Sequence, residues 1–362
     1  FFFNDTATTE IYTLHIMTLK EIAKEAGVSI STVSRVLNQP NTKAASAQVQ
    51  ERIWNIVRKT GYVPNPVARE LRHALQPTPV MQSIYGLIAC SPGEVRDDPF
   101  FPRIISSIEQ EAFQSNFVLK YTYSMLEFQT PAAARQSGGC DSDNLIIVGR
   151  FQPSLLTSMK KRFRNIVYVG LNNLEAECDQ VLCDCFFAVR DTVRYFYDRN
   201  HRNIAFIGAE QEGRYRGYLE GLRLCGLPPC PEHLVQINTL SMDGGLQGMK
   251  QLLSQNRNIT AVICANDMTA IGALRACKEL GVQVPDEISI IGINDIPNVR
   301  YVQPKISSIH VPLDEMGKMA VRTLADRING GHQLPVKISL PYHIVERASC
   351  MPCARPSGNM QT

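Results

Sequence analysis

Residues 17–38, MTLKEIAKEAGVSISTVSRVLN, contain two short helix patterns separated by a glycine, and this stretch decides the fold of the N-terminal part of the chain. Thr18 and Glu21 have the spacing of a capping box, in which each side chain binds the other residue's backbone N–H, so a helix is expected to begin at Thr18. Gly27 is expected to end this helix, because glycine readily adopts the left-handed conformation of a helix end. Ser29 can cap a second helix that follows at once.

The second helix has an apolar stripe that must pack against another helix. Val33, Val36 and Leu37 recur at helical spacing, so these side chains must face inward. A third helix is expected over residues 46–60, where apolar residues again recur at helical spacing. Two helices joined by a tight glycine-containing turn, with a third in support, indicate a helix-turn-helix that binds DNA.

The same residues carry a resemblance to a known family. Over residues 17–38 the match to the lac repressor/galactose repressor (LacI/GalR) family of bacterial transcription regulators is nearly continuous. The resemblance implies a sequence-specific transcription regulator, most simply a repressor, that is controlled by a small molecule.

The outward face of the second helix carries the side chains expected to read DNA. By resemblance, Ile30, Ser31 and Arg35 occupy the base-reading positions. A guanidinium such as that of Arg35 can pair with two acceptors of guanine, and Ile30 can touch a thymine methyl group. Because Ile30 lies one turn before Val33, its alternative is a place in the core. Contacts to phosphates, which position the head without reading sequence, are expected from Thr18, Ser29, Thr32 and Ser34. Asn38 is also expected to bind DNA.

Residues 61–72, GYVPNPVARELR, resemble the hinge of the family. Asn65 can cap a helix of about two turns, which is too short to be stable alone. The resemblance implies that this hinge helix orders on DNA beside the hinge of a second subunit, with Asn65, Ala68 and Leu71 at the DNA. Leu71 matches the leucine that wedges into the minor groove and kinks the duplex. The alternative is that Leu71 is an ordinary core residue.

Positive charge is concentrated in this N-terminal part. Residues 17–75 hold nine lysines and arginines against four acidic residues, whereas the whole chain of 362 residues has a formal net charge of +3. A basic head on a nearly neutral body indicates a module that binds nucleic acid joined to one that does not.

The composition of the whole chain, with 44% hydrophobic and 20% charged residues, is ordinary for a soluble globular protein. We expect no membrane-spanning segment, because no apolar run approaches the roughly 18 residues that such a helix needs. Eleven scattered cysteines favour reduced thiols in a cytoplasmic protein. A zinc or redox site at Cys350 and Cys353 is the alternative.

The chain divides into segments of different character. Residues 1–16 resemble translated sequencing-adapter read-through, so we expect a non-native leader and a native start at Met17. The expected order is then a DNA-binding head over 17–62, a hinge over 63–75, an effector-binding and dimerisation body over 84–350, and a tail over 351–362.

The body shows alternating strand and helix patterns, which favour doubly wound parallel sheets. Strands are expected at 86–90, 145–149, 166–169, 204–207, 261–265 and 288–293, and helices near 103–115, 186–199, 214–225, 269–280 and 315–329. This length exceeds what one such sheet usually needs, so two lobes are expected. The family resemblance extends to about residue 350 and implies a periplasmic-binding-protein-like α/β body.

Ligands of such sheets bind beyond the carboxyl ends of the strands, where polar and aromatic residues gather in this sequence. Arg214 begins an R-x-x-G match to the family, and Phe101 follows the first strand, where family members place an aromatic residue over the ligand. The expected effector site comprises Phe101, Asp184, Arg214, Asn266, Asp267 and Asn294. Asp267 has an alternative, because it can merely cap the helix that follows.

These residue types indicate the class of effector. Guanidinium, amide and carboxylate groups can bind hydroxyls, and an aromatic ring can cover the C–H face of a sugar, so a sugar is expected. Asn294 stands where many relatives have aspartate, and residues 294–297, NDIP, resemble the evolved β-galactosidase repressor branch, which favours a galactoside.

Other functional classes are less well supported. The sequence lacks the phosphate-binding, dinucleotide-binding, nucleophile-elbow and zinc-protease motifs, so no enzymatic activity, cofactor or metal is expected. The main rival is a secreted sugar receptor without a DNA-binding role, against which the head and the cysteines argue. Because no heptad tail follows the body, a homodimer on a near-palindromic operator is expected.

Overall fold

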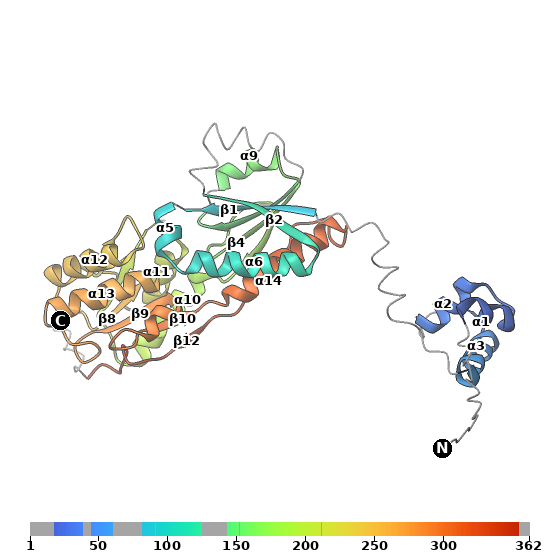
Figure 1. Cartoon of the computed structure of the whole chain (residues 1–362). Coiled ribbons are helices and arrows are strands. Elements are labelled where there is room, and N and C mark those ends of the chain that lie inside the picture. Colours follow the sequence, from blue (N-terminus) through green and yellow to red (C-terminus); the bar gives the residue numbers. More distant parts are fainter. Residues whose placement is uncertain are drawn as a thin grey trace, which may run out of the picture. The chain divides into compact units, whose positions relative to one another are not determined.

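The computed structural model describes residues 18–38, 45–60, 82–90, 92–124, 143–151, 153–210 and 212–354. Its contacts divide the chain into two units, Phe1–Val80 and Met81–Thr362 (Figure 1). The expected leader 1–16 and the hinge residues Asn65, Ala68 and Leu71 lie outside the described residues.

The described part of the first unit contains the three expected helices, α1 (Leu19–Ala26), α2 (Ile30–Asn38) and α3 (Ala47–Thr60). The capping box of α1 is present: the Thr18 N–H donates to the Glu21 carboxylate at 2.7 Å, and the Glu21 N–H donates to the Thr18 hydroxyl at 3.4 Å. Gly27 ends the helix with a φ of 67°, in the left-handed region that glycine favours.

A small apolar core holds the three helices together. Its buried members come from all three helices and are Ile22, Ala23, Ala26, Val33, Val36, Ile53 and Ile56. Val33 and Val36 therefore face inward as expected, and Leu37 packs partly buried against them. This arrangement leaves the opposite face of α2 free of the core.

The second unit is built on two six-stranded sheets, as the sequence predicts (Figure 1). The first sheet has the order β11-β5-β4-β3-β1-β2, and all its paired neighbours are parallel. Its strands are β1 (Gln82–Ala89), β2 (Phe117–Ser124), β3 (Asn144–Gly149), β4 (Asn165–Gly170), β5 (Asp179–Leu182) and β11 (Lys337–Ser339).

The second sheet has the order β12-β10-β9-β8-β6-β7, and only its edge strand β12 is antiparallel to its neighbour among the pairs of the described residues. Its strands are β6 (Ile204–Gly208), β7 (Leu234–Gln236), β8 (Ala261–Cys264), β9 (Ser289–Asn294), β10 (Ser307–His310) and β12 (His343–Val345).

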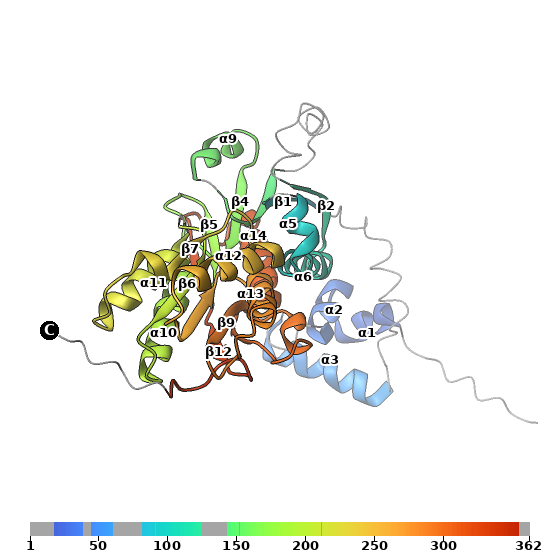
Figure 2. The same cartoon turned by 90° about the vertical axis from the view of Figure 1, so that its left-hand side faces the viewer.

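Helices cover both sheets because the strands are apolar on both faces. On the first sheet, α6 (Phe100–Gln114) and α14 (Leu313–Ile328) pack together, and α9 (Leu156–Lys160) contributes Leu156 and Met159 to the other face. On the second sheet, α10 (Cys185–Asp198) pairs with α11 (Gly213–Leu224), and α12 (Met242–Gln255) pairs with α13 (Asp267–Glu279) (Figure 2). The remaining described helix, α5 (Pro92–Asp97), follows β1, and short 3₁₀ turns lie at Pro153–Leu155, Pro231–His233 and Pro297–Arg300.

The chain passes between the two sheets three times, from β5 to α10, from β10 to α14, and from β11 to β12. We call the part built on the first sheet, residues 82–182 and 313–339, the N-lobe. The C-lobe is the part built on the second sheet, residues 185–310 and 343–354. Because of the crossings, each lobe contains segments that are far apart in the sequence.

No helix in the described ranges is both long enough and apolar enough to cross a membrane.

Candidate functional site

The side chains expected to read DNA lie on the outward face of α2. Ile30 is 44% exposed and takes no part in the buried core, so the alternative that it is a core residue is not supported. Ser31 and Arg35 are exposed one turn apart, and the Arg35 Nε donates to the Ser31 carbonyl at 3.4 Å. The three side chains are therefore free to meet a groove of DNA together.

Three of the residues expected to contact phosphates, Thr18, Ser29 and Thr32, lie at the beginnings of α1 and α2. The Ser29 hydroxyl accepts a hydrogen bond from the Thr32 N–H at 3.1 Å and lies 2.8 Å from the hydroxyls of Ser31 and Thr32. Ser29 thus caps α2, as Thr18 caps α1. Ser34 is half-buried within α2, and Asn38 is its last residue.

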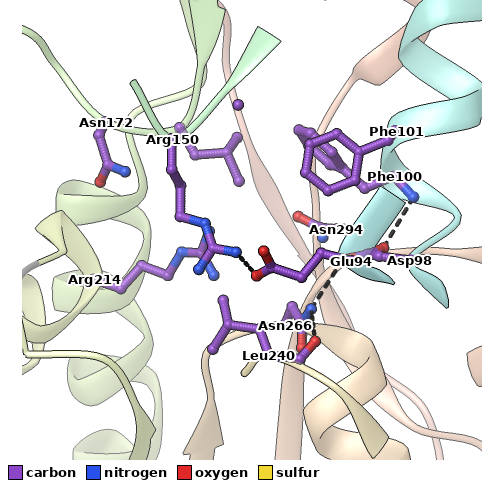
Figure 3. Close-up of a pocket in the computed structure, with 12 residues that line it drawn as sticks. Glu94, Asp98, Phe100, Phe101, Arg150, Asn172, Arg214, Leu240, Asn266 and Asn294 are labelled. Atoms are coloured by element: carbon purple, nitrogen blue, oxygen red, sulfur yellow. Dashed lines mark hydrogen bonds and ion pairs between the residues drawn. The ribbon is translucent and has the colours of Figure 1, made fainter. Parts of the chain in front are cut away.

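A pocket of about 480 Å³, part of it open to solvent, lies in the second unit where the two sheets present the carboxyl ends of their strands (Figure 3). Both lobes contribute to it. The N-lobe supplies Glu94, Asp98, Phe100, Phe101, Gly149, Arg150, Leu171 and Asn172, and the C-lobe supplies Arg214, Leu240, Asn266 and Asn294. Parallel strands place ligands at this edge of a sheet, so the pocket has the expected position.

An aromatic wall forms one side of the pocket. Phe100 and Phe101 occupy the first turn of α6, with ring centroids 5.1 Å apart in an edge-to-face arrangement. Asp98 fixes this turn, because its carboxylate accepts the Phe100 N–H at 2.9 Å. A Cβ atom at Gly149 would lie 3.1 Å from the Phe101 ring, so the glycine at the end of β3 leaves room for the ring.

Asn266 connects the two lobes at the pocket. Its amide nitrogen donates to the Asp98 carboxylate at 3.0 Å and to the Leu240 carbonyl at 2.9 Å. Its amide oxygen accepts the Thr269 N–H and so caps α13. Burial raises the pKa of Asp98, which this hydrogen bond partly opposes.

Two arginines share one carboxylate beside the aromatic wall. Arg214, at the start of α11, donates to the Ala265 carbonyl, and its Nε lies 3.3 Å from the Glu212 carboxylate. Arg150, directly after β3, donates to the other oxygen of Glu212 at 3.2 Å and pairs with Glu94 (Figure 3). Arg214 is only 5% exposed, so its charge depends on these neighbours.

Asn294 ends β9 and turns its side chain into the pocket (Figure 3). It is 3% exposed, and its amide oxygen has no hydrogen-bond partner among the described residues. Its φ of 113° is unusual for a residue with a side chain, and Asp295 follows with a φ of 55°. A buried acceptor of this kind suits a ligand that donates a hydrogen bond.

Two residues of the expected effector set do not line the pocket. Asp184 caps α10 by accepting the Phe186 N–H at 2.9 Å. The Asp267 carboxylate is fully buried and accepts the Ile296 N–H at 2.8 Å and the Ser308 hydroxyl at 2.6 Å. The expectation that Asp184 and Asp267 face the ligand is therefore corrected, since both side chains are engaged in fixing backbone.

Several lining residues are absent from the effector site expected from the sequence, among them Glu94, Arg150, Asn172 and Leu240. Arg150 directly follows the end of β3, and Asn172 lies two residues after the end of β4. The rule that ligands bind beyond strand ends could have found these two. Leu240 follows β7, a three-residue strand whose pattern is too short to recognise.

The cysteines form no metal-type cluster with histidines or acidic residues in the part of the chain that the structure describes. The Cys350 thiol donates to the Ile290 carbonyl at 3.2 Å, and burial raises its pKa to about 11. It is therefore protonated at neutral pH, which does not suit a reactive redox thiol.

Asp267→Asn is expected to reduce the loss of stability with rising pH that Asp267 causes between its unfolded pKa and its folded pKa of about 8. Burial raises the pKa of Asp267 to about 8, so the folded state holds a proton that the unfolded chain releases near the ordinary value of 3.8. The stability contributed by the protonated form is fully present below the unfolded value and is lost as the pH rises through about 8. The thermal midpoint of the variant, measured from about pH 6 to pH 9, should fall less than that of the unmodified protein.

The matched control is Asp314→Asn. The Arg103 guanidinium holds the pKa of Asp314 below its ordinary value, so this carboxyl is ionised in both states throughout the same pH window. Its variant should keep the unmodified slope. Equal slopes for Asp267→Asn and the unmodified protein would show that Asp267 does not titrate there.

Comparison with known proteins identifies both units. The family described as bacterial regulatory proteins, lacI family, matches residues 18–65, and the periplasmic binding protein-like domain matches residues 193–350. The HTH-type transcriptional repressor PurR of Erwinia tasmaniensis is 32% identical over 342 residues, which are 92% of this chain and 96% of that protein. PurR of Photorhabdus laumondii is 31% identical over 344 residues, again 92% and 96%.

Solved structures agree with the fold. A transcriptional regulator in a CelR–cellobiose complex matches with a TM-score of 0.67 at 23% identity, covering 92% of this chain and all of that one. The lac repressor dimer bound to operator and the anti-inducer ONPF matches at 0.64 and 23%, covering 92% and 99%. A LacI family regulator from Enterococcus faecium with bound ribose matches at 0.63 and 25%, covering 74% and 99%.

The helix-turn-helix head, the two-lobed α/β body and the near full-length relatives thus confirm the resemblance that the sequence predicts. The chain belongs to the lacI family of bacterial regulatory proteins, and it is a DNA-binding transcriptional repressor controlled by a small-molecule effector.

Proposed function

We propose that the effector is a sugar, with a galactoside as the first choice, and that it binds in the pocket between the lobes. The observation that carries the proposal is the division of the pocket lining into one aromatic wall and a remainder that is mostly polar. Phe101 offers a flat apolar surface to C–H groups. Arg214 and Asn294 provide a donor and an acceptor for hydroxyls.

The charges of the pocket also favour a neutral, hydroxylated ligand. Arg150 and Arg214 are matched by Glu94 and Glu212, so the described lining residues offer no unpaired cation to an anionic ligand. Hydroxyls can donate and accept at once, which suits a site where carboxylates and guanidiniums alternate. The regulator from Enterococcus faecium, whose structure contains ribose, shows that a body of this fold can hold a sugar.

A purine-related effector is the second candidate. The curated relatives carry the name PurR, and the flat ring of Phe101 can stack on a planar base. The other apolar side chains that line the pocket, however, include the aliphatic Leu171 and Leu240, and among the described residues its rings are Phe100 and Phe101 alone.

A thermal-shift screen of the full-length protein against galactosides, other sugars and purine bases decides between the two. A ligand at about 100 times its dissociation constant stabilises the folded state by roughly 2.7 kcal/mol. The proposal expects a galactoside or another sugar to raise the midpoint and purine bases to leave it unchanged. A shift with a purine base and none with any sugar would replace it with the second candidate.

For the head, we propose that a homodimer places two copies of α2 in the major grooves of a near-palindromic operator, within the cytoplasm. Exposed Ile30, Ser31 and Arg35 support the base-reading role. The positioning contacts are assigned to Thr18, Ser29, Thr32 and Ser34, and Asn38 is assigned a further contact with DNA. The hinge contacts of Asn65, Ala68 and Leu71 are proposed from the family resemblance alone.

Leu71→Ala is expected to weaken operator binding and to reduce DNA bending together. Leucine cannot form hydrogen bonds, so its use in a minor groove is to unstack a base step, at a cost of a few kcal/mol that the added contacts repay. Bending can be measured by the mobility of complexes with the operator at different places in a DNA fragment. Identical bending by both proteins would make Leu71 a packing residue.

A further inference from the structure

A bridge of charges crosses the pocket from one lobe to the other. The Arg150 guanidinium, which follows β3 in the N-lobe, pairs with Glu94 of the same lobe through Nη2. Through Nη1 it donates to Glu212, the residue before α11 in the C-lobe, at 3.2 Å. We call Glu94, Arg150 and Glu212 the lobe bridge.

Because these groups are partly buried, the lobe bridge should contribute more to stability than an ion pair on the surface. The side chains of Glu212, Glu94 and Arg150 are 8%, 18% and 30% exposed. Charges withdrawn from water to this extent are screened less by salt than exposed ones, and losing a partner leaves the remaining charge poorly solvated. The cross-lobe contact of Arg150 with Glu212 should therefore resist separation of the lobes.

The same guanidinium faces the pocket (Figure 3). A guanidinium has five N–H donors, and the two ion pairs with described residues use two of them, so about three are left for a ligand. Within the C-lobe, the Glu212 Oε2 and Arg214 Nε atoms are buried without a hydrogen-bond partner among the described residues, although they lie 3.3 Å apart. A ligand in the pocket thus meets a charge network that still has hydrogen bonds to offer.

We propose that Arg150 is a further residue of the effector site, which donates to an oxygen of the effector while its pair with Glu212 holds the lobes together. Because Glu94 and Glu212 flank it, the effector group beside Arg150 is a neutral one that also donates, such as a hydroxyl; a phosphate there would be repelled. This inference deepens the effector class proposed above and rests on it only for the ligand contact. The Arg150 side chain then contacts both the effector and the opposite lobe, so effector binding and the arrangement of the lobes depend on the same residue.

The bridge is tested without any ligand by amide hydrogen exchange of the full-length protein. The variants are Glu212→Gln, which removes the negative charge of the cross-lobe partner, Arg150→Met, and the double variant. Arg103→Met is the matched control, because Arg103 pairs with Asp314 across α6 and α14 inside the N-lobe at 2.9 Å and does not line the pocket.

Glu212→Gln is expected to speed exchange at least roughly tenfold, which corresponds to about 1.4 kcal/mol, in segments 143–151 and 212–224 on both sides of the pocket. The effect of the double variant should be smaller than the sum of the two single effects, because both single variants lose the same Arg150–Glu212 contact. Arg103→Met should match the unmodified protein in both segments. Unmodified exchange in Glu212→Gln, or additive effects in the double variant, would overturn the bridge.

The ligand contact is tested with the compound that most raises the thermal midpoint in the screen. Arg150→Met is expected to lose at least roughly tenfold in affinity for it, about 1.4 kcal/mol, while Arg103→Met keeps the full affinity. Full affinity in Arg150→Met would overturn the contact. Failure of the sugar proposal would show in the screen itself and leave the exchange result standing.

Discussion

Arg35→Ala is expected to abolish discrimination between operator and scrambled DNA and to leave weak, salt-sensitive binding. Arg35 is exposed on the outward face of α2, on the side opposite the buried Val33 and Val36. A bidentate contact from a guanidinium to guanine supplies roughly 1–3 kcal/mol of discrimination at each half-site. Both half-sites lose it in a dimer, so the operator preference should fall by about the square of the single-site factor.

The measurement is a competition titration by fluorescence anisotropy at fixed salt, with labelled operator against scrambled duplex. The matched control is Arg58→Ala, since Arg58 is also exposed but lies on α3. This control removes the same charge and should lower both affinities without changing their ratio, because phosphate contacts carry no sequence information. An unchanged ratio for Arg35→Ala would remove Arg35 from the reading face.

Arg214→Ala is expected to eliminate the effector response while the protein still binds operator. Arg214 lines the pocket, is 5% exposed, and donates to the Ala265 carbonyl next to Asn266. Its removal deletes a ligand donor and leaves the buried Glu212 with one partner fewer, and breaking a buried pair costs about 3–5 kcal/mol. The body should therefore melt at a lower temperature as well.

Arg216→Ala separates loss of the site from general damage to α11. Arg216 lies on the same helix but is exposed, and it does not line the pocket. Its variant should keep both stability and response. Operator binding is titrated with the effector found in the thermal screen, and a response of Arg214→Ala at the unmodified effector concentration would contradict its place in the site.

The elements that were predicted from the sequence are those with a strong local signal. The capping box at Thr18, the glycine at 27 and the valine stripe of α2 depend on neighbouring residues alone, and all three are found. The strands β8 and β9 are short apolar runs followed by polar residues, and these polar ends led directly to Asn266 and Asn294 in the pocket.

The helix α12 is not predicted from the sequence, because its glycines are typical of a segment that interrupts a helix. It contains Gly244, Gly245 and Gly248, which disfavour a helix by local propensity. In the fold they allow close packing: a Cβ at Gly245 would lie 2.0 Å from the Thr269 carbonyl of α13. Tertiary contact between two helices outweighs the local preference, and no pattern within α12 reveals its partner.

The errors in the effector site have a similar origin. Asp267 and Asn266 both follow β8, but only the fold shows that Asp267 turns inward to the Ile296 N–H and Ser308, while Asn266 faces Asp98. Arg150 and Glu212 are 62 residues apart, so their contact could not be inferred without the lobes. The ends of the predicted strands therefore indicate the location of a site, but they do not identify all the side chains that line it.

Selection of DNA from a random pool by the full-length protein shows whether the head is a sequence-specific operator-binding module. We expect enrichment of a near-palindromic site with half-sites about one helical turn apart or a multiple of it. The enriched site should bind about 10³-fold or more tightly than scrambled DNA at physiological salt. Retention of DNA without any enriched sequence would show that the head does not read an operator.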